Sequence, residues 1–170
     1  MDMKNLKKVA MTLCSLIVFI SPLANADVIT TNTFRIECES VEYTEEICQL
    51  PGSAIEIKRK KTYSDWPCRE HLEWGWRPGG DVLSAYNGCR GRFEVTLNYP
   101  ITIQNFQCSS QSNGYNSCLI PGGSNYGLNP VVWVYDRHSN ANCKKGINWG
   151  VDGSNLWVNN GCRATFSTVN

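Results

Sequence analysis

Residues 87–93 read NGCRGRF, and residues 160–166 read NGCRATF. The two stretches share an Asn-Gly pair, a cysteine, an arginine and a phenylalanine at the same offsets. An Asn-Gly pair is a strong signal for a tight turn between antiparallel strands. Each stretch is therefore predicted to be a turn that enters the last strand of a β structure.

The cysteines before these two stretches repeat in the same order. Cys38 and Cys48 are ten residues apart, as are Cys108 and Cys118, and the second cysteine of each pair begins the pattern C-x-x-P-G. A Trp-Gly pair follows six residues after the third cysteine of each set. Repeated anchors at matching offsets indicate two tandem copies of one four-cysteine module.

The first 26 residues are typical of a secretory signal peptide. Three lysines precede an apolar run over residues 9–20, and small residues at 24–26 suit cleavage. The run is too short to span a membrane. We expect a signal peptide over 1–26, a first module over 27–100 and a second over 101–170. The expected location is the periplasm or the extracellular space, with no transmembrane segment after signal removal.

Removal of the signal leaves eight of the nine cysteines, an even number typical of a disulfide framework in an oxidising compartment. The ten-residue spacing favours pairing of the first cysteine with the second, and hence of the third with the fourth. Pairing of the first with the fourth stays open. The favoured pairs are Cys38–Cys48, Cys68–Cys89, Cys108–Cys118 and Cys143–Cys162.

The local patterns predict strands. Ile55 to Ile57 and Phe93 to Leu97 alternate, Val131 to Tyr135 is rich in β-branched and aromatic residues, and the mature chain has no sustained apolar period of 3.6 residues. The predicted fold is all-β, with two tandem, small antiparallel β modules of barrel or sandwich type. Modules of this size bury little surface, so disulfides are expected to supply part of their stability.

The pattern W-G-x-D followed by L-W-V-x-x-G-C-R-A-x-F, over Trp149 to Phe166, resembles the end of an exported bacterial family catalogued as domain of unknown function 3011. The second copy carries the fuller match, from Cys108. The first copy keeps the cysteines and Trp74-Gly75 but has Gly91 in place of the alanine. The resemblance implies export and a small disulfide-bonded domain, and it implies no activity.

Residues suited to catalysis are scarce. The two histidines, His71 and His138, fall at unmatched places in the two copies, and no G-x-S-x-G motif is present. The cysteines form no C-x-x-C pair, and export favours disulfides over zinc. We expect a protein that is not an enzyme and that needs no cofactor or metal; a hydrolase is the last alternative.

Charge gives no general attraction to nucleic acid. The chain has 16 basic and 15 acidic residues, and loss of the three lysines and one aspartate of the signal leaves a net charge of −1. Such a balance does not favour polyanions. We therefore expect no nucleic-acid partner.

The tryptophans divide into two kinds. Trp74 and Trp149 stand at matched places, which favours a role in the core beside a disulfide. Trp157 has Ser84 as its counterpart, so the fold tolerates a small residue there. A tryptophan that the fold does not require is a candidate for ligand contact. Aromatic rings pack on the C–H faces of sugars, and amides bond their hydroxyls.

The predicted function is that of an exported binding protein for a carbohydrate or another cell-envelope component. The alternative is a protein-binding inhibitor of a secreted hydrolase, with residues 122–130 as its contact loop. Arg163 is a candidate for ligand binding, and the alternative for it is a structural role beside the disulfide. The candidate ligand-binding residues are Trp157, Asn159, Asn160, Arg163, Tyr115 and Tyr126.

The even cysteine count after removal of the signal predicts that the mature protein has no free thiol. Titration with a thiol reagent in denaturant, without reductant, is expected to detect none, because all eight cysteines are paired. Two or more reactive thiols, or stoichiometric zinc, would contradict the disulfide framework.

Overall fold

The computed structural model describes residues 28–112, 114–123 and 130–169, and within these ranges the regular structure is all strand. No helix long and apolar enough to cross a membrane occurs in these ranges. The eleven strands are β1 (Val28–Glu39), β2 (Glu46–Gln49), β3 (Ala54–Thr62), β4 (Trp74–Trp76), β5 (Val82–Ala85), β6 (Arg90–Ser109), β7 (Tyr115–Leu119), β8 (Val132–Arg137), β9 (Trp149–Asp152), β10 (Asn155–Asn159) and β11 (Arg163–Val169).

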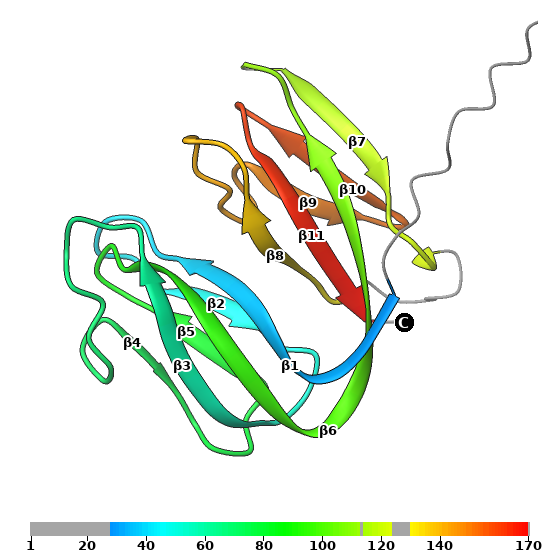
Figure 1. The fold of residues 1–170 in the computed structure, drawn as a ribbon. Helices are drawn as coiled ribbons and strands as arrows, with labels where there is room; N and C mark the ends of the chain where they lie inside the picture. Colours follow the sequence, from blue (N-terminus) through cyan, green and yellow to red (C-terminus); the bar gives the residue numbers. More distant parts are fainter. Residues whose placement is uncertain (1–27, 113, 124–129, 170) are drawn as a thin grey trace, which may run out of the picture.

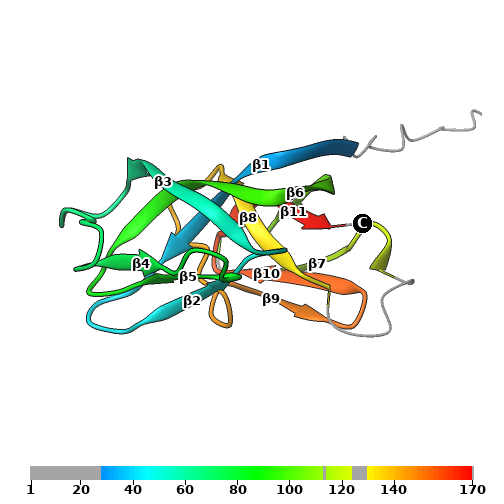
Figure 2. The same cartoon turned by 90° about the horizontal axis from the view of Figure 1, so that it is seen from below.

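The strands form two layers, as Figure 2 shows. One layer is a five-stranded sheet in the order β1-β6-β11-β8, with β3 also paired to β6. The other contains two three-stranded sheets, β2-β5-β4 and β7-β10-β9. Every strand pair is antiparallel. The prediction of an all-β fold is confirmed. Because the sheets are open, they agree with the sandwich type and not with a closed barrel.

Strand β6 runs through both halves of the molecule (Figure 1). Its first part, Arg90 to Leu97, pairs with β1 and β3, and its last part, Ile103 to Ser109, pairs with β11. The boundary expected after Pro100 therefore falls inside a strand. The division into modules over residues 27–100 and 101–170 stays a prediction. We call residues 28–100 the first half and residues 101–169 the second half.

All four disulfides have the pairing that the cysteine spacing favoured. Their Cα–Cα distances are 5.9 Å for the two pairs that are ten residues apart, and 5.1 and 5.2 Å for the other two. These separations lie in the normal range for disulfides. Each half therefore has one disulfide that joins a long strand to the short strand after it, β1 to β2 and β6 to β7, and one at the residue before its last strand.

One tryptophan occupies the same place in the core of each half. Trp74 is 3% exposed and Trp149 is 4% exposed. The indole Nε1–H of Trp74 donates to the carbonyl oxygen of Cys68 (3.1 Å), and that of Trp149 donates to Cys143 (2.9 Å). Each ring also packs on a phenylalanine, Phe93 of β6 for Trp74 and Phe166 of β11 for Trp149, with centroids 5.0 and 5.3 Å apart. Both tryptophans therefore belong to the core.

A third buried tryptophan joins the two halves. Trp133 lies on β8 in the second half, is 2% exposed, and packs on Phe34 of β1 with ring centroids 5.1 Å apart. Its Nε1–H donates to the carbonyl oxygen of Arg35 (2.9 Å). The core of the first half is thus completed by a side chain from the second.

Replacement of Trp149 by alanine is expected to destabilise the protein by about 3–5 kcal/mol, because it leaves a cavity beside Phe166 and removes the bond to Cys143. Trp74→Ala is the matched variant, and a loss of similar size is expected from it. Urea denaturation followed by circular dichroism measures both. Stability within about 1 kcal/mol of wild type, where most surface substitutions fall, would contradict the core role.

Candidate functional site

Three of the predicted ligand-binding residues lie together on the outer face of the β7-β10-β9 sheet. On β10, Leu156 and Val158 are fully buried, so Trp157 and Asn159 point to the other side. Asn159 pairs across the sheet with Tyr115, which is 69% exposed. We call Tyr115, Trp157 and Asn159 the aromatic face.

The ring of Trp157 lies over a glycine of the neighbouring strand. Trp157 pairs with Gly150 on β9, and a Cβ atom at Gly150 would come within 2.5 Å of the indole ring. A glycine at this position leaves room for the ring to lie across the backbone. In the first half Ser84 pairs with Gly75, and the space beside Gly75 is open. The same strand pairing therefore exists without the aromatic side chain.

The remaining predicted residues are not part of the aromatic face. Asn160 is exposed and lies in the turn after β10, where its φ is +50°. Arg163 lies on β11 in the other layer, and since Ala164 and Phe166 are buried, its side chain points away from the core on the opposite side of the sandwich. Its backbone N–H donates to Ser139. Tyr126 lies outside the described residues.

A cleft in the first half contains exposed aromatic residues that the sequence analysis did not select. Trp66 is 70% exposed and Tyr43 is 90% exposed, and both line a cleft of about 640 Å³. The sequence signal that selected Trp157, a tryptophan without an aromatic counterpart in the other copy, also applies to Trp66. Trp66 stands two residues before the third cysteine, and the residue at that place in the second copy is Ala141.

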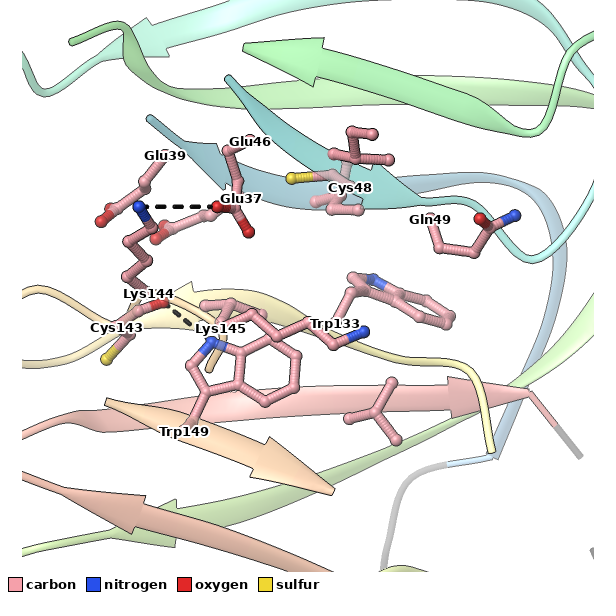
Figure 3. Close-up of a pocket in the computed structure, with 14 residues that line it drawn as sticks. Glu37, Glu39, Glu46, Cys48, Gln49, Trp133, Cys143, Lys144, Lys145 and Trp149 are labelled. Carbon is pink, nitrogen blue, oxygen red and sulfur yellow. Dashed lines mark hydrogen bonds and ion pairs between the residues drawn. The ribbon is translucent and has the colours of Figure 1, made fainter. Parts of the chain in front are cut away.

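Charged side chains line part of the space between the two halves. Figure 3 shows carboxylates of the first half facing lysines of the second; Glu46 and Lys144 form an ion pair at 3.8 Å. Lys145 lies over the ring of Trp149, with its Nζ 5.7 Å from the ring centre. The cavity that remains has room of only about 30 Å³, which suits a water molecule and not a sugar. We therefore regard this region as a structural interface.

Glu37 is at the centre of this interface. It is 7% exposed, forms an ion pair with Arg92 (2.9 Å) and accepts a hydrogen bond from the hydroxyl of Tyr63 (2.8 Å). Arg92 also contacts Asp136 of the second half. These contacts connect β1, β6 and β8 through charged groups.

Glu39 is a second buried carboxylate of the interface. It is 5% exposed, and its Oε1 lies 2.9 Å from Nη1 of Arg137, without the angle of a hydrogen bond. Burial raises the pKa of Glu39 because the charged form loses its hydration, and this effect outweighs the attraction of Arg137. The folded protein therefore holds a proton on Glu39 more tightly than the unfolded chain does.

No cluster of three histidine, cysteine, aspartate or glutamate side chains is placed to hold a metal ion in the described part of the chain. The loop proposed for inhibition of a hydrolase lies mostly outside that part, since residues 124–129 are not described. The aromatic face and the cleft are two surfaces of the described residues where aromatic side chains can contact a ligand.

These observations define a class of protein: a disulfide-bonded, all-β sandwich with an exposed tyrosine and a half-buried tryptophan on a sheet face, and exposed aromatic side chains in a cleft. The chain belongs to the family described as protein of unknown function DUF3011, whose model matches residues 20–166. It is 25% identical over 135 residues to a protein named Lectin ADEL from Aplysia dactylomela, which covers 79% of this chain. The chain spans 61% of that relative's length. No solved structure matches the chain.

The raised pKa of Glu39 predicts an unusual pH dependence. Above pH 4.5, the ordinary value for Glu, the unfolded chain releases this proton before the folded protein does, so deprotonation favours unfolding. We expect the unfolding free energy of wild type to fall relative to that of Glu39→Gln as pH rises through the folded-state pKa. Urea denaturation across a pH series measures the difference.

Glu45→Gln serves as the control, because Glu45 is exposed and lies outside the interface. Its unfolding free energy is expected to follow that of wild type across the pH series. A difference between wild type and Glu39→Gln that is constant with pH, or one in which wild type gains stability as pH rises, would contradict the interpretation of Glu39.

Proposed function

We propose that the protein is an exported, non-enzymatic carbohydrate-binding protein whose ligand contacts the aromatic face of the second half. The observation that carries this proposal is the placement of Trp157. Its ring packs on the backbone of Gly150, and an exposed tyrosine and a half-buried asparagine lie on the same face. Flat aromatic groups beside amides are suited to the C–H faces and hydroxyls of a sugar ring.

Two further observations support the proposal. The similarity to a lectin agrees with sugar binding, although the family itself is described as of unknown function. Four disulfides are typical of a protein that works in an oxidising compartment, which agrees with an exported protein acting in the periplasm or outside the cell. A glycan or another envelope component is the partner class that we propose.

Removal of the Trp157 ring is expected to weaken ligand binding and to leave the fold intact. Trp157→Ala should lower affinity for the best glycan on an array by about 1–3 kcal/mol, as for a contact hot spot. Its melting temperature should stay within a few degrees of wild type, because Ser84 occupies this position in the first half. Array binding, a titration with the selected glycan and a melting curve test these points.

Ile47→Ala is the matched control. Ile47 is 57% exposed and pairs with Ser84 on the corresponding sheet of the first half. It should change neither binding nor melting. Unfolding by Trp157→Ala as severe as that by Trp149→Ala would place Trp157 in the core and contradict the proposal, as would full glycan binding by Trp157→Ala.

A further inference from the structure

The cleft in the first half is formed by three segments that two disulfides hold together. The segments are the β1–β2 loop, the β3–β4 loop and the turn that leads into β6, and Asn142 of the second half adds to the lining beside Arg90. Cys38–Cys48 closes the first loop, and Cys68–Cys89 ties the second loop to the turn. The volume of about 640 Å³ is within the range of small-molecule sites. Because its walls are cross-linked, the cleft is formed before any ligand arrives.

Hydrogen bonds fix the loop that carries Trp66. The hydroxyl of Ser64 donates to the carbonyl oxygen of Trp66 (2.9 Å) and accepts from the backbone N–H of Arg90 (3.4 Å). The Trp66 ring nevertheless stays 70% exposed, and Tyr43 on the opposite loop is 90% exposed. Two large aromatic side chains exposed at one cleft mark a place for contact with a ligand.

The arginines of the cleft already have partners. Arg69 is bound to Glu73 through two side-chain bonds of 2.7 and 3.1 Å. Arg90 donates to Asn142 (3.0 Å) and to the carbonyl oxygen of Tyr63 (3.3 Å). Both guanidinium groups are therefore hydrogen-bonded within the protein, and that of Arg69 is paired with a carboxylate.

Two carboxylates of the cleft lack such partners. Glu42 and Asp65 are exposed, and no ion pair or side-chain hydrogen bond joins either of them to another residue that the structure describes. At the matched positions the second half has Ser112 and Asn140, which are uncharged. The first-half cleft therefore presents free negative charge beside exposed aromatic rings.

We propose that this cleft is a second binding site, specific for cationic amino sugars such as oligomers of deacetylated glucosamine. The ammonium group of an amino sugar is attracted both to carboxylates and to the face of an indole ring. The flat sides of the rings of Trp66 and Tyr43 suit the C–H faces of the sugar. Acidic sugars are expected to be excluded, because they would meet Glu42 and Asp65. The inference goes beyond the proposed function, since it concerns other residues in the other half.

The test is a calorimetric titration of the full mature protein with a glucosamine hexamer and with its N-acetylated counterpart. We expect wild type to bind the glucosamine hexamer more tightly, with affinity that falls as salt is raised. Trp66→Ala is expected to lower this affinity about tenfold or more, as at a contact hot spot, with an unchanged melting temperature. Ile55→Ala, at an exposed position of β3 outside the cleft, is the control and should leave this affinity unchanged.

A charge variant separates recognition of the ammonium from packing of the sugar. Glu42→Gln combined with Asp65→Asn should reduce affinity for the glucosamine hexamer and leave that for the N-acetylated hexamer unchanged. This combination would assign the preference to the two carboxylates. Equal loss for both hexamers would overturn the assignment to cationic sugars.

The other outcomes overturn the site. The site would be wrong if wild type did not bind the glucosamine hexamer, or if Trp66→Ala bound it as tightly as wild type does. It would also be wrong if a lysine pentapeptide displaced the bound hexamer as effectively as free hexamer does. That last result would indicate a basic peptide as the ligand. Loss with Trp157→Ala alone would overturn the cleft and leave the aromatic face. Loss of hexamer binding in Trp66→Ala supports the cleft, even if Trp157→Ala has no effect on the binding of any glycan. The two proposals can therefore fail separately.

Discussion

The disulfide between the third and fourth cysteines of each half is the constraint on which the rest of the structure depends. Cys68–Cys89 joins the loop after β3 to the residue before β6, and Cys143–Cys162 does the same before β11. The carbonyl group of the third cysteine then accepts the indole N–H that fixes the core tryptophan. Because a small module buries little surface, this combination of cross-link, hydrogen bond and ring packing holds its two layers together.

The side chains around these disulfides differ between the halves. Trp157 covers Gly150 in the second half, and the corresponding space over Gly75 is open. Trp66 is exposed in the first half, where the second has Ala141. Each half thus has an aromatic residue that the shared strand pairing does not require. We infer that a similar cross-linked framework supports different ligand surfaces in the two halves, as is common for small folds.

Local sequence signals predicted the fold class and the disulfides, because cysteine spacing and Asn-Gly turns act over short distances. They did not predict β6 as one strand or the contact of Trp133 with Arg35, which joins residues 98 positions apart. Within the candidate site, strand alternation explains why Trp157 and Asn159 share a face. Arg163 does not join them because the turn at Asn160 takes the chain into the other layer. Trp66 carried the same signal as Trp157, the absence of a matching aromatic residue.

The buried charges between the halves have a consequence for ligand binding. Apolar packing, as of Trp133 on Phe34, is non-directional and tolerates small shifts of one half against the other. Ion pairs are more demanding. Those of Glu37 with Arg92 and of Glu39 with Arg137 form only when the charged groups are closely aligned. Burial of these charges costs free energy, so we infer that they orient the halves more than they stabilise them. A fixed orientation sets the distance between the aromatic face and the cleft. An oligosaccharide that spans both would meet the second site at high effective concentration only where its length fits that distance.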